Sequence, residues 1–137
     1  MKFSQQRINQ VSNHLTLPMA KSRITTHVLD TAHGVAAQNV LVHLHYYEQD
    51  EWKLLGSEKT NSDGRCQGLN VSNGIANDLN PGLYRLTFDI KSYYKSLNIQ
   101  PFFPEAQIVF QVSDPPNQHY HVPLVVTPFA YNTYRGT

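Results

Sequence analysis

The sequence has 137 residues, of which 15% are charged, and its formal net charge is +1. This length suits a single domain, which can bury roughly two-thirds of the surface of its unfolded chain. The near-neutral balance gives no basic stripe for a nucleic-acid backbone, and no run of about 18 apolar residues could span a membrane. We therefore expect one folded core, with no nucleic-acid and no membrane partner.

Residues 1–22 are mostly polar and are predicted to form a leader before a domain at 23–137. No apolar segment follows Met1, so secretion through a signal peptide is not expected. One stretch of the leader resembles the N-terminal peroxisomal targeting signal, which is a basic and an aliphatic residue, five residues of any kind, then His and Leu. The residues concerned are Arg7, Ile8, His14 and Leu15. We expect a peroxisomal protein, with a disordered leader on a cytoplasmic protein as the alternative.

Short runs of alternating apolar and polar residues follow the leader, and this period of two is typical of half-buried β-strands. Strands are predicted at Ile24–Leu29, Val40–Tyr47, Trp52–Glu58, Leu83–Ile90, Ala106–Val112 and His119–Val126, with a final segment after Pro128. About seven short strands favour an all-β fold, an antiparallel Greek-key β-sandwich. The exception is Lys91–Leu97, which is predicted to be one short helix.

Turn residues separate these runs. Residues Asp30–Ala37 should form a loop around Gly34, and a tight connection at Gln49 and Asp50 should make a hairpin. The strongest turn signal is Asn61-Ser62-Asp63-Gly64-Arg65, where Gly64 can take a positive φ and the Asp63 side chain can bond to nearby backbone. We expect this turn to hold Arg65 at a fixed bend.

Alternation also predicts which histidines point away from the core. In the run His119–Val126 the apolar residues occupy one face, so His119 and His121 lie on the other. The same pattern turns His27 outward beside a buried Val28. Each could be an ordinary exposed histidine, but imidazoles titrate near neutral pH and suit acid–base chemistry, with arginine as a holder of anions.

Other kinds of site are weakly supported. His43-x-His45 and His119-x-His121 have the strand spacing of zinc or copper ligands, but neither contains an acidic residue that could support a ligand, and no metal is expected. There is no Gly-x-Ser-x-Gly elbow and no glycine-rich phosphate loop. Cys66 is the single cysteine, so it cannot form an internal disulfide, and we expect a structural thiol.

The tail, Tyr131–Thr137, has an unusual composition for a chain end. It contains two tyrosines, an arginine and two threonines within seven residues, whereas chain ends usually carry little information. We therefore predict that the tail belongs to a binding or catalytic site.

Three motifs and the tail together resemble the 5-hydroxyisourate hydrolases, the enzyme branch of the transthyretin-like proteins. The motifs are Thr25-Thr26-His27-Val28-Leu29-Asp30-Thr31, Asn61-Ser62-Asp63-Gly64-Arg65-Cys66, and His119-Tyr120-His121-Val122-Pro123-Leu124 with Tyr134-Arg135-Gly136-Thr137. The resemblance runs from about residue 22 to the last residue. It implies a transthyretin-like sandwich assembled as a homotetramer, with active sites in a channel where two dimers meet.

The resemblance also implies a reaction, the cofactor-free hydrolysis of 5-hydroxyisourate to 2-oxo-4-hydroxy-4-carboxy-5-ureidoimidazoline in urate degradation. The residues that match the family's catalytic set are His27, Arg65, His121 and the terminal Thr137; those that match substrate-binding positions are His27, Arg65, Tyr134 and His119. One histidine would activate water and later protonate the leaving nitrogen, and which of the two does so stays open. The arginine would stabilise the anion.

Two positions depart from the family pattern. The family usually ends in Ser, whereas Thr137 keeps the hydroxyl and adds a methyl group, and Ala36 stands where Pro is usual. We expect activity to survive both changes. The alternatives are a transthyretin-like carrier, whose branch lacks the combination of His27, Arg65 and His121, and a copper or zinc sandwich enzyme.

Overall fold

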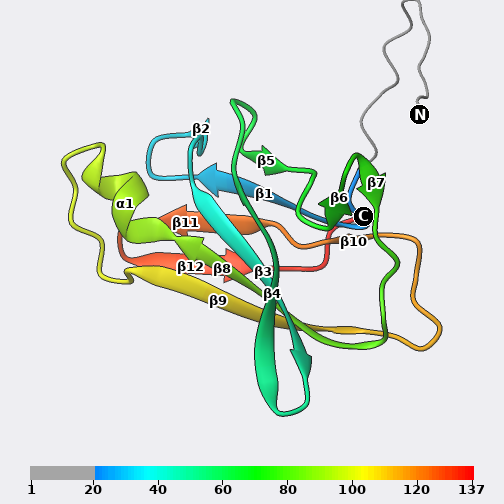
Figure 1. Cartoon of the computed structure of the whole chain (residues 1–137). Helices are drawn as coiled ribbons and strands as arrows, with labels where there is room; N and C mark the ends of the chain where they lie inside the picture. The colour runs from blue at the N-terminus through cyan, green and yellow to red at the C-terminus, as the bar shows by residue number, and fades with distance from the viewer. Residues whose placement is uncertain (1–20) are drawn as a thin grey trace, which may run out of the picture.

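The computed structural model describes residues 21–137, which form two main β-sheets packed face to face, a separate two-stranded sheet, and a short helix at one end (Figure 1). The elements are β1 (Ile24–Asp30), β2 (Val35–Ala36), β3 (Leu41–Glu48), β4 (Glu51–Lys59), β5 (Arg65–Cys66), β6 (Val71–Ser72), β7 (Ile75–Ala76), β8 (Gly82–Asp89), α1 (Ile90–Lys95), β9 (Glu105–Val112), β10 (Tyr120–His121), β11 (Leu124–Thr127) and β12 (Ala130–Thr133). The predicted all-β sandwich with one short helix is confirmed over these residues.

The sheet that carries the predicted site residues is built around β1. Its strand order is β10-β1-β11-β12, and β2 and β5 also pair with β1. β1 runs parallel to β10 and β11 and antiparallel to β2 and β5, so the sandwich is not purely antiparallel. The second sheet, β4-β3-β8-β9, is antiparallel throughout. β1 is thus the strand against which the distant parts of the chain assemble.

The core lies between the sheets, as period-two alternation predicts. Buried apolar side chains come from both layers: Ile24, Val28, Leu124 and Val126 from the first sheet, and Val42, Leu44, Leu86, Phe88, Ala106 and Val112 from the second. The hairpin of β3 and β4 is also confirmed, with Gln49 and Asp50 both at positive φ. Helix α1 begins after Asp89, whose side chain accepts a hydrogen bond from the backbone N–H of Ser92.

Two predictions of detail are wrong. The run His119–Val126 is not one strand but two, β10 and β11, because Pro123 has no N–H to continue a ladder. The inward face predicted for this run is nevertheless kept, since Tyr120, Val122, Leu124 and Val126 are all buried. The predicted loop Asp30–Ala37 contains a short strand, β2, which pairs back onto β1.

The leader prediction falls mostly outside the described part of the chain. Arg7, Ile8, His14 and Leu15 all precede residue 21, so the targeting pattern stays a prediction. Within residues 21–137, no helix has the length and apolar character needed to cross a membrane.

Candidate active site

His27 and Arg65 lie opposite each other on neighbouring strands. They are register partners in the antiparallel pair of β1 and β5, and both side chains are half-buried. The turn before β5 is fastened to β1, because the backbone N–H of Val28 donates to the carbonyl of Gly64 at 2.7 Å. The predicted fixed bend therefore delivers the guanidinium beside the imidazole.

Gly64 is required at this bend for two reasons. Its φ is +75°, and a Cβ atom there would lie 2.5 Å from the carbonyl oxygen of Val28. The side chain that stabilises the turn is Asn61, not Asp63 as predicted. The Asn61 side-chain oxygen accepts from the backbone N–H groups of Asp63 and Arg65, at 2.9 and 3.0 Å.

Two further histidines, His119 and His121, meet β1 at Thr25. This threonine is the register partner of His121 across β1 and β10. Its Oγ1 lies 2.8 Å from Nδ1 of His121 and 2.9 Å from Nε2 of His119, and the two imidazole rings are stacked with centroids 6.1 Å apart. The side chain of Thr25 is buried, that of His121 is half-buried and that of His119 is exposed. Thr25 was not among the site residues predicted from sequence, although alternation places it on the same face as His27.

The tail folds back over His121. After β12 the chain forms a bridge in which the N–H of Gly136 donates to the carbonyl of His121 at 2.8 Å. A Cβ atom on Gly136 would lie 2.5 Å from Cδ2 of the His121 ring. Glycine at this position therefore allows the tail to pass directly against the imidazole and carries Thr137 toward β5.

Several of these residues, though not His27, line a common pocket of about 290 Å³ on the β1 sheet. Its lining includes Thr25, Arg65, His119, His121 and Thr137. Tyr134 lies elsewhere: it is 57% exposed and lines a neighbouring pocket of about 340 Å³ between β9 and the tail. His121 contributes to the lining of both pockets.

The electrostatics of the site favour neutral imidazoles. Burial, then the positive charge of Arg65, lowers the pKa of His27, and Asp63 opposes this shift. Burial also lowers the pKa of His121, followed by the charges of Arg65, His119 and His27, with a smaller opposite effect from the Thr25 backbone. Both histidines are therefore mostly unprotonated near neutral pH, the state in which an imidazole can accept a proton.

The other candidate groups lie apart from this pocket. His43 and His45 are on β3, in the second sheet, and are therefore separated from His119 and His121 at β10. Across residues 21–137 no three His, Cys, Asp or Glu side chains are grouped as metal ligands. Cys66 is buried, and burial raises the pKa of its thiol to about 12, so it stays protonated as expected of a structural cysteine.

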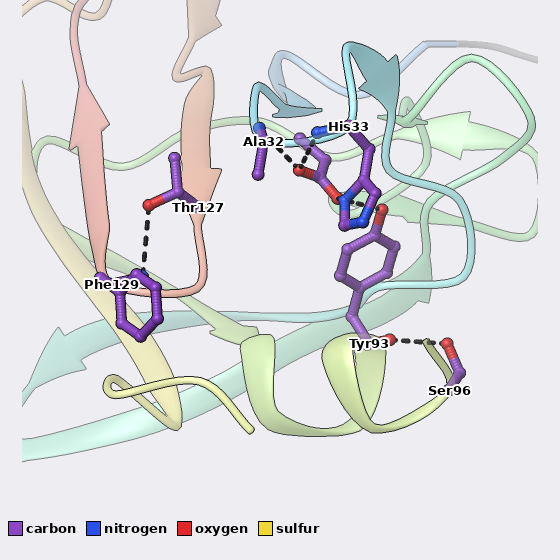
Figure 2. A network of polar contacts seen from close by, with 7 residues as sticks. Ala32, His33, Tyr93, Ser96, Thr127 and Phe129 are labelled. Atoms are coloured by element: carbon purple, nitrogen blue, oxygen red, sulfur yellow. Dashed lines mark hydrogen bonds and ion pairs between the residues drawn. The ribbon is translucent and has the colours of Figure 1, made fainter. Parts of the chain in front are cut away.

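The end of β1 is anchored by Asp30, three residues after His27. Its buried carboxylate accepts hydrogen bonds from the Tyr93 hydroxyl at 2.9 Å and from the backbone N–H groups of Ala32 and His33, and it pairs with the His33 ring at 2.7 Å. Figure 2 shows Tyr93 reaching up from helix α1 toward the loop that carries His33. This network ties β1 to the loop after it and to the helix.

Comparison with known proteins decides which family combines these features. The family model described as HIUase/Transthyretin family matches residues 24–136. The chain belongs to this family. The match spans every strand of the sandwich and all the pocket residues named above except Thr137, one residue beyond its end.

Individual members of the HIUase/Transthyretin family are similar over most of the chain. The 5-hydroxyisourate hydrolase of Mus musculus is 41% identical over 118 residues, which are 85% of this chain and 96% of the mouse protein. The 5-hydroxyisourate hydrolase of Pseudomonas aeruginosa is 36% identical over 124 residues, 88% of this chain and 95% of its own length. The uric acid degradation bifunctional protein TTL of Arabidopsis thaliana is 34% identical over 97% of this chain, which corresponds to 45% of the plant protein.

In this member of the family, the residues singled out from sequence fall into two places. Arg65, His119, His121 and Thr137 line one pocket, and His27 is the strand partner of Arg65. Tyr134 faces the adjoining pocket. The chemistry available around the Arg65 pocket is proton transfer by neutral imidazoles beside the fixed positive charge of Arg65.

Proposed function

We propose that this protein hydrolyses 5-hydroxyisourate, the reaction that opens its lactam ring in urate degradation. Membership of the HIUase/Transthyretin family and the names of the mouse and Pseudomonas relatives support the proposal. The observation that carries it is the convergence of His27, Arg65 and His121 on the β1 sheet. A carrier needs no such combination of proton acceptors and a guanidinium, so catalysis is favoured over carriage.

The proposed mechanism uses side chains of the pocket and His27, the strand partner of Arg65. A neutral imidazole, of His27 or His121, takes a proton from water as the water oxygen bonds to the lactam carbonyl carbon. The carbon–nitrogen bond then breaks, and the imidazolium returns the proton to the leaving ring nitrogen. Arg65 donates hydrogen bonds to the oxyanion that forms on the attacked carbonyl, where its permanent charge is most useful.

The tail contributes to substrate binding in this proposal. The hydroxyl of Thr137 hydrogen-bonds polar groups of the substrate at the pocket that it shares with Arg65 and His121. Tyr134 and His119 contact the substrate from the rim, since both are exposed and both adjoin His121. The methyl group of Thr137 points to a slightly narrower site than a terminal serine would give.

We also propose that the protein assembles as a homotetramer with its sites at the junction of two dimers. The open pocket on the β1 sheet supports this, because a second dimer over it would exclude water and strengthen the interaction of Arg65 with an anion. Size-exclusion chromatography with light scattering should give four times the mass of one chain. A monomer that is fully active would contradict the proposed assembly.

The decisive test of function is a decay assay. Freshly generated 5-hydroxyisourate, which also decays spontaneously, is mixed with purified protein and its ultraviolet absorbance is followed. We expect decay to accelerate in proportion to protein concentration. Binding of the substrate with an unchanged decay rate would instead establish the carrier.

We propose, finally, that the pattern Arg7-Ile8 with His14-Leu15 directs the protein to peroxisomes. A fluorescent protein fused after the full chain should co-localise with a peroxisomal marker. The matched variant Arg7→Ala with His14→Ala should become cytosolic. Cytosolic fluorescence of the unaltered fusion would contradict the proposal.

A further inference from the structure

Thr25 occupies a position that the proposed reaction does not yet use. Its hydroxyl is within hydrogen-bond distance of two imidazole nitrogens, Nδ1 of His121 and Nε2 of His119. The residue is 5% exposed, so bulk water is a poor substitute for either contact. Its neighbour Thr26 is also buried, but the Thr26 hydroxyl donates to the backbone carbonyl of Val122 and touches no titratable group in the hydrogen bonds of the described chain.

A single hydroxyl between two imidazoles links their tautomers. The hydroxyl has one proton, so it donates to one ring nitrogen and accepts from the other. In one state His121 carries its proton on Nδ1, which leaves Nε2 free to accept, and Thr25 donates to His119. In the other state Nε2 of His119 donates to the Thr25 hydroxyl, and the hydroxyl donates to Nδ1 of His121. His121 then carries its proton on Nε2.

We propose that Thr25 is a positioning residue that relays a proton between His121 and His119 during hydrolysis. This inference rests on the proposed function, because it concerns how the base of that reaction is reset to an acid. His27 has a different neighbour, the backbone of Asp63, so the relay serves His121 and not His27.

Each transfer in the relay breaks one bond to a proton and forms another. Nε2 of His121 gains the proton released by the attacking water while its Nδ1–H bond breaks. That proton forms an O–H bond on Thr25, whose own proton moves to Nε2 of His119. The net change is one added proton, held as imidazolium on His119, and a neutral His121 with Nε2–H. The same steps in reverse follow when His121 donates to the leaving nitrogen.

The charges around the pair give this transfer a direction. His121 is half-buried and faces Arg65 on β5 and His27 on β1, with Lys21 also lining the pocket, so a positive charge on it is disfavoured. Arg135 of the tail lies further off, with its guanidinium carbon 5.1 Å from the Tyr120 ring. His119 is exposed, and water can solvate its charge. The relay therefore moves the positive charge from a half-buried ring to an exposed one.

The first test measures the coupling without any reaction. The full chain is labelled with ¹⁵N at histidine, and the ring nitrogens of His119 and His121 are followed by NMR as the pH is lowered. We expect the tautomer of His121 to change with the same midpoint as protonation of His119. Thr25→Val should separate the two events, and Thr25→Ser should restore their coincidence. Equal titration curves in the wild type and Thr25→Val would overturn the relay.

The second test measures the rate. Thr25→Val should lower kcat about tenfold, the order of one lost hydrogen bond, with KM changed less than about twofold. Thr25→Ser should keep most of the activity. The matched control is Thr87→Val in the second sheet, because the buried Thr87 hydroxyl has no hydrogen-bond partner among residues 21–137. This control should retain the wild-type kcat.

A third variant guards against misfolding of Thr25→Val. His119→Gln removes the far end of the relay and leaves Thr25 in place, and it should lower kcat by a similar factor. The double variant should lose no more than either single variant. Full additivity, or a wild-type kcat in either single variant, would overturn the relay. A wild-type protein that does not accelerate decay would refute the proposed function instead, and the NMR titration would still decide whether Thr25 couples the two histidines.

Discussion

His121 is held from several sides, and each contact acts on a different property of its imidazole. The Thr25 hydroxyl meets Nδ1, the backbone of Gly136 fixes the strand carbonyl, and Arg65 acts on the charge of the ring. Position and proton affinity are therefore set by separate residues. Substitutions can separate these effects.

Removing the imidazole tests its role in proton transfer. His121→Asn should lower kcat by about 10² to 10⁴, the usual contribution of a general acid or base. The amide is small enough to leave the tail in place, so the chain should keep its wild-type assembly state. The matched control, His43→Asn on β3, lies in the other sheet and should keep full activity. Similar rates for the two variants would argue against a proton-transfer role for His121.

Removing the positive charge at position 65 should shift two titrations upward. Arg65 disfavours the imidazolium form of His27 and His121, so in Arg65→Gln the pKa of both should rise toward the ordinary value of 6.5. The acid limb of the kcat profile should move to higher pH in parallel. NMR titration of the histidines checks the sign. Arg85→Gln is the control, because the charge of Arg85 acts on a different histidine, His45, whose pKa is lowered first by burial and then by Arg85.

At the scale of elements, the turn before β5 decides where Arg65 lies. Two glycines of positive φ in turns beside β1 differ in their surroundings. Gly64 is buried and crowded by the carbonyl of Val28, whereas Gly34 is exposed and a Cβ there would meet nothing within 4 Å. Substitutions at these two glycines therefore separate the cost of a positive φ from the cost of a steric clash.

Alanine at these two glycines should have unequal effects. Gly34→Ala should destabilise the fold by about 1 kcal/mol, the cost of a left-handed backbone for a residue with a side chain. Gly64→Ala adds the collision with β1 and should cost at least about 3 kcal/mol. It should also lower activity by moving Arg65. Urea unfolding measures both values, and equal losses would show that the contact with Val28 relaxes freely.

Sequence patterns predicted most of the elements because alternation and turn chemistry are local. The strands that carry the core, the hairpin at Gln49 and the helix all follow from neighbours within a few residues. What could not be predicted depends on distant partners. Thr25 meets His119 across 94 positions of the chain, and the parallel pairing of β1 with β10 and β11 brings together segments equally far apart.

The same reasoning accounts for what was predicted of the site. The outward direction of His27 and His121 followed from alternation alone, and the bend at Arg65 followed from Gly64. Which of these residues share one pocket did not follow from local patterns, because that grouping depends on the tail crossing His121 at Gly136. Resemblance to a family supplied that grouping. It also gave Tyr134 as a substrate-binding residue, which stays a prediction, and the structure places Tyr134 at the adjoining pocket.

At the scale of the whole molecule, Asp30 joins the site-bearing strand to the rest of the fold. Its carboxylate connects β1 to the loop with His33 and to Tyr93 of helix α1. Burial raises the pKa of Asp30, but hydrogen bonds from Tyr93 and His33 outweigh this effect and leave the pKa below its ordinary value of 3.8. The ionised form is thus the form that the folded state prefers.

This preference predicts how stability depends on pH. A carboxylate with a lowered folded pKa stabilises the fold above its unfolded pKa of 3.8, and the contribution is lost as the pH falls through the lower folded value. Asp30→Asn keeps the shape but removes the charge that four donors share, and at neutral pH it should lower the free energy of unfolding by about 2 kcal/mol. Below about pH 4 the difference from the wild type should shrink. Urea midpoints from pH 2 to 7 measure it, with Asp78→Asn, an exposed carboxylate, as the control. A difference that stayed constant over this range would mean that Asp30 acts through its shape and not through its charge.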